Sequence, residues 1–148
     1  MDAVGPWSLV RFLHVTGAVV WVGGQLALSL VVLPLARRML SADARDGFVA
    51  GAGRRFGLLT GAVFLPLQLG TGWAMAWHTG VTWASLAGPG YGRTLAAKLG
   101  LFVLVMLAAA GHGVAYAKGR PGLARALAVG SLAGSLGVVL LATALPVT

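Results

Sequence analysis

The amino-acid sequence predicts an all-α integral membrane protein, a bundle of four transmembrane helices. Of its 148 residues, 58% are hydrophobic and only 9% are charged, whereas a soluble domain carries about 25% charged residues. Four apolar stretches are each long enough for the ~20 residues that a helix needs to cross the hydrocarbon core of a bilayer. Because so little polar surface is available, we expect one small transmembrane domain over residues 1–148.

The predicted helices follow one another along the chain, at residues 7–35, 56–77, 94–116 and 123–145. No basic region precedes the first stretch and no small-residue cleavage site follows it, so we interpret it as a retained helix and not as a signal peptide. The long first connection, residues 36–55, has room for a short amphipathic turn. The second connection, residues 78–92, ends in Gly88–Pro89–Gly90, which is a strong break signal.

The charge distribution predicts the orientation in the membrane. The formal net charge is +8, and most basic residues lie in the first connection and in the turn between the third and fourth helices: Arg37, Arg38, Arg45, Arg54, Arg55, Lys118, Arg120 and Arg125. By the positive-inside rule, both termini face outward, to the periplasm of a bacterial-type inner (cytoplasmic) membrane. Interleaved basic and aromatic helix faces are lacking, so we exclude nucleic acid and expect contact with the lipid bilayer and its anionic headgroups.

The residue inventory narrows the chemistry. Cysteine is absent, which excludes disulfides, thiolate-bound zinc, iron–sulfur clusters and covalently attached c-type haem. The three acidic residues, Asp2, Asp43 and Asp46, lie outside the apolar stretches. Paired-carboxylate catalysis within the membrane is therefore excluded, and histidine, methionine or lysine must hold any bound metal or haem.

Five cationic or titratable residues are expected in the outer half of the bundle, on three different helices: Arg11, His14, His78, Arg93 and Lys98. His14 is seven residues past Trp7, so roughly 10 Å below the outer interface. An ionisable ring at that depth is costly unless it serves a ligand, a proton path or a cofactor. At about 100° per residue, Trp21 and Gln25 project to the same side of the helix as His14.

This inventory matches a b-type haem, which needs axial nitrogens, small residues beside the porphyrin and cations for two propionates. His14 is the predicted axial ligand and His78 a second one. Arg11, Arg93 and Lys98 would meet the propionates, or a deprotonated Lys98 would itself ligate. Gly17 and Gly24 leave room for a flat group, with Trp21 and Gln25 beside it. A purely structural interpretation is also open, in which His14 fixes helix packing and the Lys98 side chain extends to the membrane–water interface. His112, near a helix end, is the weaker metal ligand.

The chain contains three pairs of short sequence motifs: Leu13–Val15 with Val20–Gly24, Arg54–Phe56 with Leu69–Trp73, and Leu95–Leu99 with Gly111–Gly113. They resemble the first three helices of the CopD-like membrane protein family, whose superfamily includes the HemJ-type protoporphyrinogen oxidase. The resemblance to the oxidase implies haem b bound through His14, an important role for Lys98 and an oxidoreductase activity. The long spacing from Lys98 to His112 favours the broader family over this specific enzyme.

The sequence thus predicts a haem b-binding membrane redox protein, which transfers electrons or oxidises a small substrate with quinone or oxygen as acceptor. Two alternatives remain open. One is copper handling or transport through Met75 and His78, a thioether–imidazole pair at positions i and i+3. The other is a non-catalytic membrane assembly subunit or homo-oligomer that uses the small residues of the fourth helix, Gly130 to Gly137.

Overall fold

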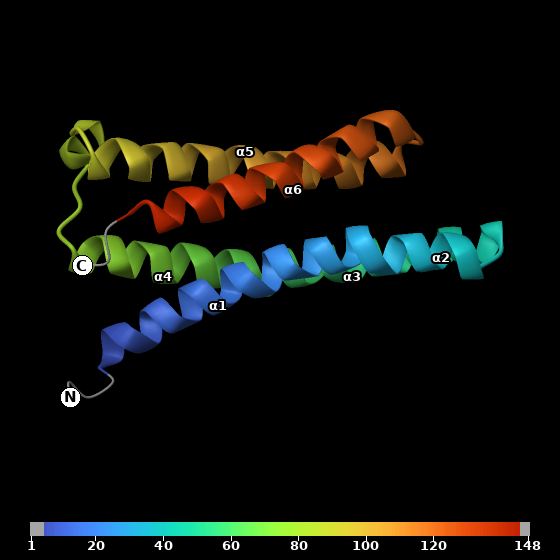
Figure 1. Ribbon diagram of the computed structural model, residues 1–148, viewed down its shortest axis with the longest axis horizontal. Helices are drawn as coiled ribbons and strands as arrows, with labels where there is room; N and C mark the ends of the chain where they lie inside the picture. Colours follow the sequence, from blue (N-terminus) through green and yellow to red (C-terminus); the bar gives the residue numbers. More distant parts are fainter. Residues whose placement is uncertain (1–4, 146–148) are drawn as a thin grey trace. The chain divides into compact units, whose positions relative to one another are not determined.

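The computed structural model describes residues 5–145, and every regular element in that range is helical (Figure 1). Four continuous helical stretches are long and apolar enough to cross a membrane: Pro6–Met39, Ala42–His78, Tyr91–Ala117 and Pro121–Thr143. The all-α class and the four predicted spans are therefore confirmed, and the chain is a multi-pass membrane protein.

The first two spans each contain a π-helical turn. The first consists of α1 (Pro6–Ala27), η1 (Leu28–Val32) and α2 (Leu33–Met39), and the second of α3 (Ala42–Leu59), η2 (Thr60–Phe64) and α4 (Leu65–His78). Each π turn ends two residues before a proline, Pro34 in one span and Pro66 in the other. Proline lacks an N–H and its ring clashes with the carbonyl four residues earlier. The wider turn accommodates that carbonyl, so both spans continue through their prolines.

The first connection differs from the expectation. We expected a long connection over residues 36–55 with a short amphipathic turn, but α2 continues to Met39 and α3 begins at Ala42, so only Leu40 and Ser41 lie between the helices. Alanine and arginine, which are strong helix formers, are frequent in this stretch. The spans therefore extend beyond their apolar parts, and the basic residues of this connection lie on helices.

The second connection contains the predicted break. After α4 the chain forms the short 3-10 helix η3 (Ala84–Ala87), and α5 (Tyr91–Ala117) begins directly after Gly90, whose φ is 73°. Gly92 lies so close to the carbonyl of Ser85 that a side chain at this position would overlap it. Glycine is therefore required where η3 packs on the first turn of α5.

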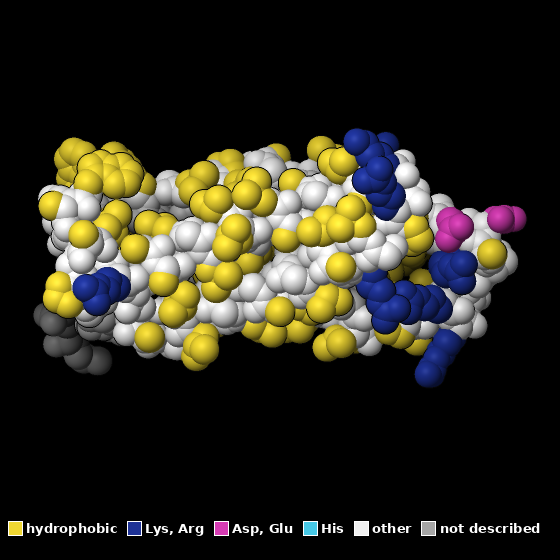
Figure 2. All heavy atoms as spheres, turned by 90° about the horizontal axis from the view of Figure 1, so that it is seen from above, with side chains coloured by type: hydrophobic (Ala, Val, Ile, Leu, Met, Phe, Trp, Pro, Cys, Tyr) yellow, Lys and Arg dark blue, Asp and Glu magenta, His cyan; other side chains and the backbone are white. Residues whose placement is uncertain are grey.

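The described residues form two compact units, one up to His78 and one from Thr79 onward. In the first unit α1 packs against α4, and in the second α5 packs against α6 (Pro121–Thr143), so each unit is a helical hairpin. Most large apolar side chains of both units are exposed, as expected for helices that contact lipid. Figure 2 shows one face of the molecule, where the charged side chains gather near helix ends and the stretches between them are apolar or uncharged.

Candidate functional site

His14 projects from α1 toward α4. Its Nδ1 lies 2.8 Å from the hydroxyl oxygen of Thr71, and this hydroxyl donates a hydrogen bond of 2.5 Å to the carbonyl of Leu67. Because the hydroxyl has a single proton and donates it to the carbonyl, it accepts from His14, so Nδ1 carries the ring proton. The neutral ring then has its lone pair on Nε2, which is the state that a histidine needs to bind a metal.

Gln68 holds the backbone of α1 at the same level. Its side-chain Nε2 donates a 2.7 Å hydrogen bond to the carbonyl of His14, and the residue is only 7% exposed. Two glycines make room for these contacts. A Cβ at Gly17 would lie 2.8 Å from Gln68 Nε2, and a Cβ at Gly72 would lie 3.3 Å from His14 Cε1. The His14 side chain is thus positioned by Thr71 and Gly72, and its main chain by Gln68.

Trp21 makes the next contact along this interface. Its Nε1 donates to the hydroxyl of Thr60 at 3.1 Å, and this hydroxyl donates to the carbonyl of Phe56 at 2.8 Å. The indole also stacks on Phe64, with ring centroids 4.7 Å apart and an interplanar angle of 9°. Thr60 and Phe64 are the first and last residues of η2, so the π turn presents both partners of Trp21 on one side of the helix.

The space beside Gly17 and Gly24 is filled by protein, contrary to our expectation of room for a flat ligand. The Gln68 amide lies against Gly17, and a Cβ at Gly24 would lie 2.8 Å from Phe56 Cε2. The glycines therefore permit close packing of α1 against α3 and α4. Gln25, one residue after Gly24, is half-buried.

His78 lies at the open end of the first hairpin. Its ring stacks on Trp7, with centroids 3.8 Å apart and an interplanar angle of 12°. Trp7 precedes His14 by seven residues, which is roughly 10 Å along α1. The structure therefore gives the two histidines different partners and does not bring them together. Arg11 is exposed three residues before His14, and Met75 is half-buried three residues before His78.

The remaining predicted site residues belong to the second unit. Lys98 is half-buried on α5, and Arg93 is exposed near the start of that helix. His112 Nδ1 lies 2.8 Å from the carbonyl of Ala124 on α6. Since a carbonyl only accepts hydrogen bonds, Nδ1 donates, and a neutral His112 also has its lone pair on Nε2. His112 thus ties α5 to α6.

Thr60, Gln68 and Thr71 are the residues of this interface that our sequence analysis missed. A signal for the two threonines was present, because they lie eleven residues apart and so face the same side of a helix with 3.6 residues per turn. His14 and Trp21 are separated by seven residues, about two turns, and also share a face. Matching these two pairs predicts the cross-helix bonds, provided that the register of the hairpin is known.

The side chains that could act as metal ligands limit the kinds of metal site. Within residues 5–145 there is no group of three or more His, Cys, Asp or Glu side chains that could hold a metal ion. A haem iron needs only one or two protein ligands, so single histidines remain sufficient for that cofactor. No known protein family, curated protein or solved structure matches the chain.

Proposed function

We propose that this chain is a haem b-binding membrane redox protein of CopD-like type, with His14 as an axial ligand of the iron. The observation that carries the proposal is the hydrogen bond between His14 and Thr71, which leaves the lone pair on Nε2. Histidines that bind metals nearly always donate their other N–H to a partner that fixes the ring. Thr71, itself anchored on Leu67, would be that partner.

The first unit supplies further groups that fit a haem. Arg11 precedes His14 by three residues and therefore lies on the same side of α1, where its guanidinium would neutralise a propionate. The interface between α1 and α4 is filled, so the cofactor would approach His14 from its Nε2 side. His78 stacks on Trp7 and lies apart from His14, so we propose His14 as the iron ligand that this unit supplies. When bound, haem b supplies one-electron redox chemistry, which supports electron transfer or oxidation of a small substrate with quinone or oxygen as acceptor.

The proposed cellular setting is a bacterial-type inner membrane with both termini outside. Arg37 and Arg38 lie in the last turn of α2, and Arg54 and Arg55 lie on α3. Arg37 and Arg38 thus adjoin the tight turn of the first hairpin, and Arg54 and Arg55 lie farther along α3 in the half of the span nearer that turn. Basic residues are enriched on the cytoplasmic side of membrane proteins. The opposite end of this hairpin has the stacked Trp7 and His78, and tryptophan is favoured at membrane interfaces.

An absorption spectrum of the purified protein, before and after dithionite, tests the proposal. We expect a Soret band, with α and β bands that sharpen on reduction. His14→Ala should abolish the Soret band, whereas the matched variant His112→Ala, which removes a ring with the same type of Nδ1 hydrogen bond, should retain it. A parent protein that stays featureless after haem is added would refute the proposal.

Thr71→Val tests the orienting contact separately. Loss of such a supporting hydrogen bond weakens metal binding by about 10- to 100-fold, so we expect faster haem transfer to apomyoglobin than from the parent. Thr71→Ser keeps the hydroxyl and should restore retention. Equal retention in parent and Thr71→Val would mean that Thr71 does not position a ligand.

Copper handling is the second candidate, because Met75 and His78 combine a thioether with an imidazole. The His78 ring, stacked on Trp7, is exposed at the end of the hairpin. This candidate predicts a colourless protein whose Cu(I) binding is lost in Met75→Leu.

For an assembly or homo-oligomer role through α6, the contact surface would centre on Gly130, because Gly134 and Gly137 pack against α5.

A further inference from the structure

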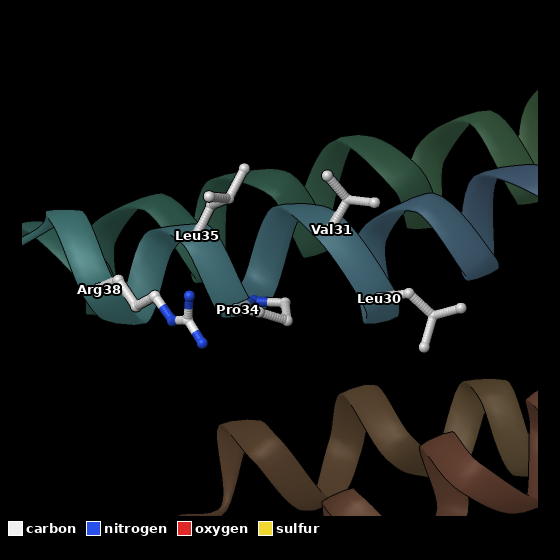
Figure 3. Close-up of a pocket in the computed structure, with 5 residues that line it drawn as sticks. All are labelled: Leu30, Val31, Pro34, Leu35 and Arg38. Atoms are coloured by element: carbon white, nitrogen blue, oxygen red, sulfur yellow. The ribbon is translucent and has the colours of Figure 1, made fainter.

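A shallow groove lies on an exposed side of η1 and α2, near the turn of the first hairpin (Figure 3). Its volume is about 320 Å³, and five residues line it: Leu30, Val31, Pro34, Leu35 and Arg38. Sixteen residues separate His14 from Leu30, roughly 24 Å along the helix. The groove is therefore distinct from the proposed haem site. We call it the Pro34 groove.

The helix geometry explains its shape. Leu30, Pro34 and Arg38 follow one another at intervals of four residues and form one ridge, while Val31 and Leu35 form a second ridge. Figure 3 shows the compact ring of Pro34 between the longer side chains of Leu30 and Arg38. The proline thus makes the low point of its ridge. The walls are apolar and open, since Leu30 is 68% and Val31 53% exposed.

One end of the groove is cationic. Arg38 is exposed in the last turn of α2, and its guanidinium is turned back along the helix toward Pro34 (Figure 3). Within residues 5–145 no carboxylate lies within ion-pair distance of Arg38, whereas Arg45 lies 3.6 Å from Asp46. From Leu30 to Arg38 the groove extends roughly 12 Å along the helix. An apolar channel of this length that ends at an unpaired guanidinium complements an acyl chain joined to a phosphate.

We propose that the Pro34 groove binds an anionic phospholipid of the surrounding membrane. Its acyl chain would lie between the two ridges, and its headgroup phosphate would contact Arg38. The turn of the first hairpin supports this occupant, because Arg37, in the same last turn of α2, adds positive charge at this end of the unit. Basic residues at the membrane boundary attract anionic headgroups, and the groove adds a fixed place for the attached chain.

Native mass spectrometry of the full chain tests the proposal. The protein is reconstituted in nanodiscs of equimolar phosphatidylcholine and phosphatidylglycerol, and the lipids that remain bound after release are counted. We expect the parent to retain phosphatidylglycerol preferentially. Arg38→Gln should lower this preference about five-fold, which corresponds to the ~1 kcal/mol that one basic residue contributes near an anionic surface. Arg37→Gln has the same change in net charge one position away on the helix, and it should keep most of the preference.

Three results would overturn the proposal. These are a parent without preference for phosphatidylglycerol, equal losses in Arg38→Gln and Arg37→Gln, and unchanged retention when Val31→Trp fills the groove while Arg38 remains. Equal losses would indicate a general attraction of the basic hairpin end for anionic lipid. The haem spectrum should be the same in Arg38→Gln and in the parent, so the outcome is independent of the proposed redox function.

Discussion

The two hairpins of this protein combine hydrogen bonds and close packing in different ways. In the first, side chains exchange hydrogen bonds between the helices, through Trp21 to Thr60, His14 to Thr71 and Gln68 to the carbonyl of His14. In the second, His112 donates to the carbonyl of Ala124, and small residues of α6 approach α5 closely. Cβ atoms at Gly134 and Gly137 would lie 2.5 Å from Val105 Cγ2 and 2.9 Å from Leu101 Cδ2.

Directional hydrogen bonds and close packing have different effects on the side chains at an interface. Hydrogen bonds between transmembrane helices contribute only about 0.6 kcal/mol each on average, but they have direction. They can fix the orientation and tautomer of a ring such as His14. Close packing of small residues has no such direction, and it brings helices together without selecting a protonation state. We therefore expect the chemistry in the first hairpin and a mainly structural role for the interface of the second.

Gly134→Ala should have the largest effect on stability. The new Cβ would lie 2.5 Å from Cγ2 of Val105, a β-branched side chain that is 2% exposed and has little freedom to move. Overpacking of this kind costs roughly 1–3 kcal/mol, and we expect the upper part of that range. The free energy of unfolding in mixed detergent micelles provides the measurement.

Gly130→Ala is the matched control for this prediction. Gly130 lies on the same helix one turn earlier, and a Cβ there would meet no atom within 4 Å. Its stability should change by less than about 0.5 kcal/mol. If both variants lose the same stability, α6 does not pack on α5 through Gly134, and the contrast between the hairpins fails.

Gly17→Ala should have an intermediate effect in the first hairpin. The added Cβ would lie 2.8 Å from Nε2 of Gln68, which is the flexible end of a long side chain. The amide can move away at the cost of its hydrogen bond to the His14 carbonyl, so we expect a loss of about 1 kcal/mol. Gly23→Ala, where a Cβ meets nothing within 4 Å, should be neutral. A cost for Gly17→Ala that exceeds that of Gly134→Ala would reverse the proposed difference between the two interfaces.

Hydropathy was sufficient to predict the four spans but not the full lengths of their helices. A hydropathy pattern reports where a helix can contact hydrocarbon, so it loses the helix where charged residues begin. For this reason hydropathy predicts a connection over residues 36–55, although residues 36–39 and 42–55 are helical. The π turns before Pro34 and Pro66 were also missed, because a proline in a span indicates a local irregularity without specifying its form.

The sequence predicted which candidate site residues share a face of one helix, but not which residues of the next helix they contact. Helical periodicity correctly placed His14 and Trp21 on one face of α1, and both bond to the second span. It did not identify Thr71 or Thr60 as their partners, because that requires the register between two helices. The stack of Trp7 on His78 was unpredictable for the same reason. Glycines gave a misleading signal, since a gap beside a helix can be filled by a ligand or by a side chain such as Phe56.

The smallest effect is expected for the hydrogen bond between Trp21 and Thr60, measured with a double-mutant cycle. Trp21→Phe removes the indole N–H, Thr60→Val removes the acceptor, and the cycle cancels the lost stacking on Phe64. We expect a coupling energy of about 0.6 kcal/mol, the average for such bonds between transmembrane helices. Unfolding in mixed micelles again provides the free energies.

A second cycle supplies the control for this small value. Thr16 is exposed on α1, five residues before Trp21 and so on a different side of the helix, and Thr16→Val should be additive with Trp21→Phe. Coupling of Trp21 with Thr60 but not with Thr16 would show that the first hairpin is joined by a specific, directional bond. If the Thr60 cycle is also additive, the bond contributes nothing to stability. The first interface would then depend more on close packing, as the second does.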